Sequence, residues 1–341
     1  MFIERLNEVV SQYIRLNNED DLVYARHNIA TIANTLQDEQ IKNWKASQYL
    51  RQKLQNYFFR QEIIRLHEAA QKEKITFLVL KGLPLALDLY PDPEMRPSGD
   101  IDILIRPEDL KSFVMLCMSL GYRNSSSDVL GSLDRFSNSN DQHYAALYKQ
   151  IGNYRLDLEL HTQVFASDIH RNFSIKQTTL IEVFKNIHPY NFYGTTIFTM
   201  GYLDNFIFLC VHMVKHLFWN VMCHNAAVNY VSHFSFKDLC DVGLFYKKHD
   251  MAHKSSDIVK RAKQFRVFPE VLFAMSLIQL VDPDVYNPFI DENTEYELSN
   301  YETFISKSVQ VLLPELCCDF LFWTTDELSV ALDSCTKGNK E

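Results

Sequence analysis

The first 81 residues of the chain contain neither glycine nor proline. Glycine provides the positive φ angles of tight turns and proline interrupts helices, so a segment without either favours long helices. The whole chain of 341 residues has only 9 glycines, well below the usual share of roughly 7%. An all-β fold with many tight turns is therefore disfavoured, and helix is expected to dominate.

The hydrophobic period changes once the glycine-free segment ends. Apolar residues recur every three or four positions up to about residue 74, which predicts helices. Residues 75–80 (Ile-Thr-Phe-Leu-Val-Leu) are a short apolar run typical of a buried strand. The step Lys81-Gly82 ends this run, and residues 83–89 predict a helix with proline in its first turn.

The middle of the chain mixes strands and helices. Residues 121–142 are predicted to be a loop, because 14 of these 22 residues are Ser, Asn, Asp or Gly. In chain order we further predict a strand at 101–105, a helix at 108–120, a hairpin of 143–148 and 154–164, and a β-like segment at 190–200.

The helical period then returns and continues towards the C-terminus. Helices are predicted at about 203–219, 236–248, 255–265, 269–281 and 295–311. The chain is therefore expected to have an α+β fold, with a small mixed β-sheet between N-terminal and C-terminal helices. We place the domain boundaries at 1–47 for an N-terminal helical segment, 48–200 for the core, and 201–341 for a C-terminal helical domain.

The sequence predicts a cytoplasmic protein without a membrane anchor. No targeting segment is visible, and the most apolar stretch, residues 201–223, is interrupted by charged and histidine residues. The seven cysteines are odd in number and form no C-x-x-C pair, which indicates reduced thiols. Lys+Arg 34 against Asp+Glu 43 gives a net charge of -9, so a long nucleic acid is an unlikely partner.

The segment Asp100-Ile-Asp102-Ile-Leu is the most informative part of the chain. Alternate residues of a strand share a face, so both carboxylates point one way while Ile101 and Ile103 point towards the core. Two adjacent carboxylates repel, and oxygen ligands of this kind suit Mg²⁺ or Mn²⁺. The alternative is an exposed face of an edge strand.

A later strand offers further acids. Residues 154–161 (Tyr-Arg-Leu-Asp-Leu-Glu-Leu-His) alternate, with Asp157, Glu159 and His161 on one face and leucines on the other. If this strand lies beside residues 101–105, one of its carboxylates completes a site for two ions, which suits in-line phosphoryl displacement. Upstream, Lys81-Gly82 before a helix is a weak phosphate-binding signal, since glycine permits close backbone approach and the helix N-terminus offers free N–H groups.

These motifs together resemble a known family. Strand, Lys-Gly, helix, Leu-Tyr-Pro-Asp-Pro, Arg-Pro-x-x-Asp-Ile-Asp-Ile-Leu and, later, Glu-Leu-His are similar to the uncharacterised nucleotidyltransferase family of the DNA polymerase β-type superfamily. The specific part spans residues 77–106, and weaker similarity extends over about two thirds of the chain. The sequence departs from the superfamily at Leu83, where many members have a serine or glycine after the first glycine.

The resemblance implies roles for individual residues. Asp100 and Asp102 match the metal pair, and Glu159 matches the third acid, with Asp157 as the alternative. These acids are expected to be catalytic and to bind two Mg²⁺ or Mn²⁺ ions. The nucleotide is expected to contact Lys81, Gly82, Arg96 and Gly99.

Other residues are weaker candidates for binding the acceptor or for supporting the acids. His212 and His216 are four residues apart on a predicted helix, a spacing that can bind zinc, but no H-E-x-x-H pattern or cysteine pair accompanies them. Packing in the core or lining a cleft is the simpler interpretation. The complete set of these candidates is His161, His212, Lys215, His216 and Asp238.

The function implied by the resemblance is transfer of a nucleoside monophosphate from a nucleoside triphosphate to a hydroxyl group. The acceptor is expected to be a small molecule, a peptide or a protein. The alternatives are a non-catalytic binding protein with the same fold, and a toxin-like enzyme that modifies tRNA or protein. No G-x-S-x-G, P-loop or G-x-G-x-x-G motif is present, so hydrolase, P-loop kinase and Rossmann assignments lack support.

Overall fold

The computed structural model describes residues 2–17, 39–137, 143–165, 173–222, 235–287 and 312. The chain divides into two compact units, one of residues 49–205 and one that combines residues 1–48 with 206–341. The first unit contains the sheets, and the described part of the second is helical. The fold is α+β, as the sequence predicts.

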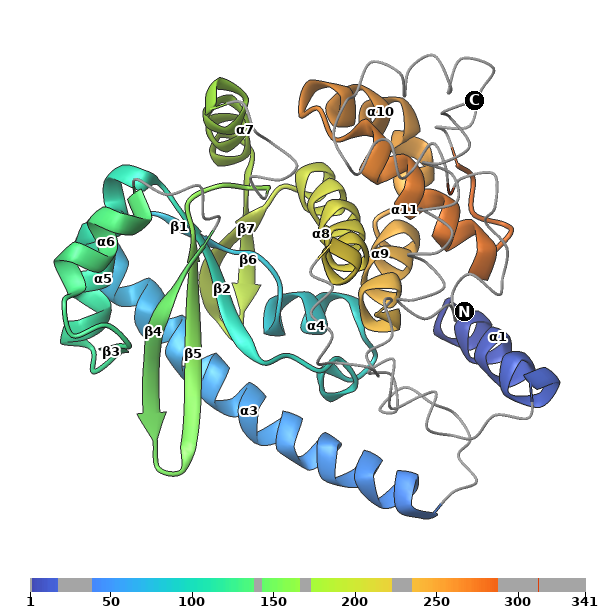
Figure 1. Cartoon of the computed structure of the whole chain (residues 1–341), viewed down its shortest axis with the longest axis horizontal. Helices are drawn as coiled ribbons and strands as arrows, with labels where there is room; N and C mark the ends of the chain where they lie inside the picture. Colours follow the sequence, from blue (N-terminus) through green and yellow to red (C-terminus); the bar gives the residue numbers. More distant parts are fainter. Residues whose placement is uncertain are drawn as a thin grey trace. The chain divides into compact units, whose positions relative to one another are not determined.

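A five-stranded mixed sheet organises the first unit, with strands in the order β1-β2-β5-β4-β3 (Figure 1). Strands β2 and β5 are parallel, and the other neighbouring pairs are antiparallel. Neighbouring parallel strands cannot be joined by a tight turn and need a long crossover connection. This is why β2 and β5 lie side by side although they are far apart in the sequence. The strands are β1 Phe77–Val79, β2 Asp100–Ile105, β3 Arg123–Asn124, β4 His143–Ile151 and β5 Tyr154–His161.

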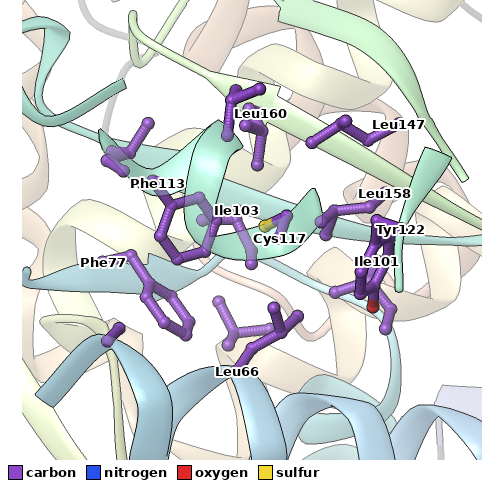
Figure 2. Close-up of a cluster of buried hydrophobic side chains, with 14 of the residues drawn as sticks. Leu66, Phe77, Ile101, Ile103, Phe113, Cys117, Tyr122, Leu147, Leu158 and Leu160 are labelled. Atoms are coloured by element: carbon purple, nitrogen blue, oxygen red, sulfur yellow. The ribbon is translucent and has the colours of Figure 1, made fainter. Parts of the chain in front are cut away.

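Two helices bury one face of this sheet. The helices α3 (Glu39–Lys72) and α5 (Leu110–Ser119) contribute Leu66 and Phe113, which pack against strand side chains such as Ile103 (Figure 2). All three of these side chains are fully buried. The hydrophobic face of the strands is therefore covered, and their polar face is left for other groups.

Outside residues 121–142, the helices and strands of this unit follow the predicted order with two differences. The predicted β-like segment at 190–200 is part of a separate hairpin of β6 (Ile187–Phe192) and β7 (Thr195–Met200). Helix α7 is not among the elements predicted from the sequence. The other elements are α4 (Leu83–Leu89), the 3₁₀ turns η2 (Pro93–Met95) and η3 (Pro107–Asp109), α6 (Val129–Ser137) and α7 (Phe173–Lys185).

The prediction of a loop over residues 121–142 is wrong at Arg123–Asn124, which form strand β3, and at Val129–Ser137, which form helix α6. Helix α6 forms there because Asp128 accepts a hydrogen bond from the backbone N–H of Gly131 (2.9 Å), the usual capping contact at a helix N-terminus. Leu133 and Phe136 then bury one side of the helix. The polar composition therefore reflects a cap and a solvated helix face rather than a continuous loop. Residues 138–142 lie outside the described residues.

The second unit is built from helices that match the predicted ones. Helix α11 is buried on nearly all sides, which is typical of a central helix. The elements are α1 (Phe2–Asn17), α8 (Tyr202–Met222, which begins in the first unit), α9 (Phe236–Lys248), η4 (Met251–Lys254), α10 (Ser255–Gln264) and α11 (Phe268–Val281). The predicted helix at 295–311 lies outside the described residues.

None of the described helices has the length and apolar character needed to cross a bilayer. Cys117, Cys210 and Cys240 are buried free thiols. The other four cysteines, at positions 223, 317, 318 and 335, lie outside the described residues.

Candidate active site

The Asp-Ile-Asp-Ile segment forms strand β2 and alternates as its sequence requires. Ile101 and Ile103 belong to the hydrophobic core, and Asp100 and Asp102 lie on the opposite face of the strand. The two acids differ in burial, since Asp102 is only 2% exposed whereas Asp100 is half-buried. A carboxylate as buried as Asp102 requires compensating partners.

The register between β2 and β5 determines which acids face each other. Asp100 is paired with Asp157, and Asp102 with Glu159. Paired residues of neighbouring parallel strands point to the same side of a sheet, so all four acids share the polar face. The alternating leucines of β5, Leu156, Leu158 and Leu160, are buried in the core.

Asp102 has two cationic or hydrogen-bonding partners. Lys81 Nζ lies 3.3 Å from Asp102 Oδ2, and His161 Nε2 lies 3.0 Å from Oδ1. Burial opposes ionisation of Asp102, but the Lys81 ammonium and the His161 contact outweigh it and hold the pKa of this carboxyl well below its usual range. Asp102 is therefore a permanently charged group at neutral pH.

Asp102, Glu159 and His161 form a cluster that can hold a metal ion. Each residue offers a ligand atom within 4.8 Å of the other two. Asp100 is not a member of this cluster but lies two residues earlier on the same face of β2. Asp157 is engaged elsewhere, because Arg155 Nε lies 2.8 Å from its Oδ1 in an exposed ion pair.

The Lys81-Gly82 step is positioned by the edge of the sheet. The backbone N–H of Leu80 donates to the carbonyl of Asp102 (3.1 Å), which brings the following Lys81 beside the site. Gly82 has φ +70, and a Cβ there would lie 3.4 Å from Ser98 Oγ. The positive φ favours glycine at this position, and Leu83 begins α4 as a buried residue.

The segment before β2 is attached to helix α3. The backbone N–H of Ser98 donates to Gln52 Oε1 (3.1 Å), and Gln52 Nε2 donates to Asn56 Oδ1 (2.8 Å). No local pattern points to Gln52, because this contact joins residues that are 46 positions apart. A Cβ at Gly99 would meet no atom within 4 Å, so packing does not require glycine there.

Arg96 is placed by a short capped turn. The Asp92 carboxylate accepts from the backbone N–H of Glu94 (3.0 Å) and from the hydroxyl of Tyr49 (2.5 Å), which fixes η2 against α3. Arg96 ends this turn and is only 3% exposed. A buried guanidinium is a strong, fixed positive charge.

The remaining candidates lie in the helical unit. His216 Nδ1 lies 3.0 Å from Asp238 Oδ2, and His212 is on the same face of α8 one turn earlier. Lys215 is half-buried on the same helix. The predicted candidates are thus divided between the sheet and the helical unit.

The site combines facing carboxylates on two adjacent parallel strands with a nearby lysine and a glycine turn. This combination suits the class of enzymes that transfer phosphoryl-containing groups. A comparison with protein-family models identifies the family. The model described as "uncharacterised nucleotidyltransferase" matches residues 14–281, and the chain belongs to this family. The resemblance to this family that the sequence shows is thereby confirmed. A comparison with curated proteins gave no significant match.

Proposed function

We propose that the chain is a nucleotidyltransferase that depends on Mg²⁺ or Mn²⁺ and uses a nucleoside triphosphate. It moves a nucleoside monophosphate to a hydroxyl of a small molecule, a peptide or a protein. The observation that carries this proposal is the buried Asp102 carboxylate opposite Glu159 on the parallel neighbouring strand. The family membership supports nucleotidyl transfer in general.

The donor set fits the proposed ions. Within the described residues, the buried Asp102 Oδ2 accepts no well-oriented hydrogen bond and has Lys81 as its counter-charge. A carboxylate oxygen in this condition has capacity for a metal ion. The carboxylate oxygens of this set suit both Mg²⁺ and Mn²⁺.

The proposed roles follow from these positions. Asp100 and Asp102 would hold two ions and Glu159 one of them; bound ions would stabilise charge on the entering and leaving oxygens. Lys81 and the buried Arg96 would balance phosphate charge, and Gly82 and Gly99 would allow backbone to approach the nucleotide. His161 would keep Asp102 oriented through its 3.0 Å contact.

The reaction consists of one displacement. The acceptor hydroxyl loses its proton, with Glu159 assisting as base, and its oxygen forms a bond to the α-phosphorus. The bond between the α-phosphorus and the bridging oxygen breaks, and pyrophosphate leaves with that oxygen and its electron pair. No redox partner is needed.

The test is transfer of label from each α-labelled nucleoside triphosphate to a pool of metabolites or peptides, with Mg²⁺ or Mn²⁺. We expect Glu159→Gln and Asp102→Asn to lower turnover at least ~100-fold, since even indirect support of a metal ligand is worth 10–100-fold. Far-ultraviolet circular dichroism checks that both variants fold. Near wild-type turnover by Asp102→Asn would contradict the metal assignment.

The matched control is Asp157→Asn, which removes an acid from the same face of β5. Asp157 is exposed and paired with Arg155, so this variant is expected to keep most of the activity. Loss of activity in Asp157→Asn but not in Glu159→Gln would instead make Asp157 the third acid. Tight binding of a nucleotide without transfer to any acceptor would favour the non-catalytic alternative.

A further inference from the structure

The helical unit contains a second group of metal-ligating side chains. His212 and His216 lie one turn apart on α8, and Asp238 comes from α9. Each of the three offers a ligand atom within 4.8 Å of the other two. We propose that they form a binding site for a divalent transition-metal ion of the zinc class, separate from the ions proposed for strands β2 and β5.

The geometry is close to that of a three-ligand zinc site. Zinc–nitrogen distances of about 2.0–2.1 Å place the ligand atoms of a tetrahedral ion roughly 3.3 Å apart. His216 Nδ1 and Asp238 Oδ2 are 3.0 Å apart, and the rings of His212 and His216 have centroids separated by 4.0 Å. All three ligand atoms lie within 4.8 Å of one another, so one ion can be placed between them.

Burial also bears on an ion here. The Asp238 side chain is only 5% exposed, and Lys237 Nζ lies 3.7 Å from its other oxygen. Both histidines are half-buried, so solvent reaches the site. A zinc ion with three protein ligands and one position for water matches such an arrangement.

The types of ligand distinguish the metal preference of this site from that of the site on the sheet. Two imidazoles and one carboxylate suit Zn²⁺ and its neighbours in the first transition row, whereas Mg²⁺ prefers oxygen ligands. Imidazole spacing of four residues along a helix is also the arrangement found in zinc-binding H-E-x-x-H motifs. The proposed ion would connect α8 to α9.

The competing interpretation is a hydrogen-bonded His216–Asp238 pair that packs the two helices together without an ion. The two interpretations differ in the role of His212. A metal ion needs His212 as its third ligand, whereas the pair does not. A substitution of His212 therefore distinguishes them without removing the 3.0 Å contact.

The experiment titrates the full metal-free chain with Co²⁺ alone, in the Asp102→Asn background, and measures the visible absorption of bound Co²⁺. We expect one tightly bound ion. His212→Ala should weaken binding at least ~100-fold, since even outer groups around a metal are worth 10–100-fold. The control is His253→Ala, because His253 forms an exposed pair with Asp250 (2.7 Å) outside any three-ligand group of the described residues.

Equal Co²⁺ affinity in His212→Ala and in its parent would overturn the proposal, as would no saturable binding by the parent. Thermal unfolding without metal checks that His212→Ala folds; if it does not, His212→Gln takes its place. The readout is independent of nucleotide transfer. Absence of transfer by the wild type, with intact Co²⁺ binding in the Asp102→Asn background, would therefore contradict only the proposed function. Transfer by the wild type without Co²⁺ binding in that background would contradict only this inference.

Discussion

The buried carboxylates Asp102 and Glu270 differ in charge because their surroundings differ. Lys81 and His161 adjoin Asp102 and lower its pKa. Glu270, in the first turn of α11, is 1% exposed, and its Oε2 has no hydrogen-bond partner among the described residues. Burial raises the pKa of Glu270 to about 7, against 4.5 when exposed. One acid is thus fixed as an anion, and the other titrates near neutrality.

Glu270 should make the stability of the protein decrease as the pH rises. Between about pH 4.5 and 7 the folded state binds more protons at Glu270 than the unfolded state, so the free energy of unfolding falls with rising pH. The loss should be about 3 kcal/mol, at ~1.4 kcal/mol per pKa unit, and should be complete above pH 7. Urea unfolding at pH 5 and pH 8 measures it.

Glu270→Gln is the diagnostic variant for this effect, because it cannot ionise. Its stability should change less between pH 5 and pH 8, and it should exceed that of the wild type at pH 8. Glu8→Gln is the control, since the Glu8 side chain is 69% exposed. A wild-type pH profile in Glu270→Gln would show that another group is responsible.

Two glycines at the junctions between elements differ in whether the packing requires glycine. Gly201 lies between β7 and α8, and a Cβ there would come 2.5 Å from the backbone oxygen of Asn186. Asn186 lies between α7 and β6, and backbone moves less readily than a side chain, so a methyl group at Gly201 must push these two junctions apart. Gly99, before β2, has neither a close neighbour nor a φ that requires glycine.

Gly201→Ala should therefore lower the free energy of unfolding by roughly 1–3 kcal/mol, the usual cost of overpacking. Gly99→Ala is the matched comparison and should change it by no more than about 0.5 kcal/mol, as at ordinary surface positions. Chemical denaturation of both variants checks this. If Gly99→Ala is stable but has lower nucleotide turnover, glycine is needed there for the ligand; equal stability of the two variants would refute the steric argument.

Helix α6 is an element that amino-acid composition alone fails to predict. Polar composition suggested a loop, yet the Asp128 cap and the buried Leu133 and Phe136 stabilise a helix. In contrast, strand β2 and helix α4 are predicted well, because the alternation of Asp and Ile over residues 100–103 and a proline in the first turn are local signals. A local pattern predicts an element correctly where the amino-acid composition of the segment does not indicate a different structure.

At the scale of the whole molecule, the net charge of -9 limits the partners of the chain. Affinity for a long nucleic acid comes mainly from cationic side chains that neutralise phosphates, and it falls steeply with salt. We expect no retention of a long single-stranded RNA at near-physiological salt, measured by electrophoretic mobility shift, while nucleoside triphosphate still binds. Tight, strongly salt-dependent binding of tRNA would instead favour a tRNA-directed enzyme.

The local part of the site follows directly from the amino-acid sequence. Alternation on a strand places Asp100 and Asp102 on one face, and Asp157, Glu159 and His161 on another, because side-chain direction has a period of two. The tertiary structure alone decided that β2 and β5 are parallel neighbours in the register that sets Asp102 against Glu159. It likewise decided that Asp238 meets His216. These contacts join distant segments, and their geometry depends on how the cores pack rather than on any local pattern.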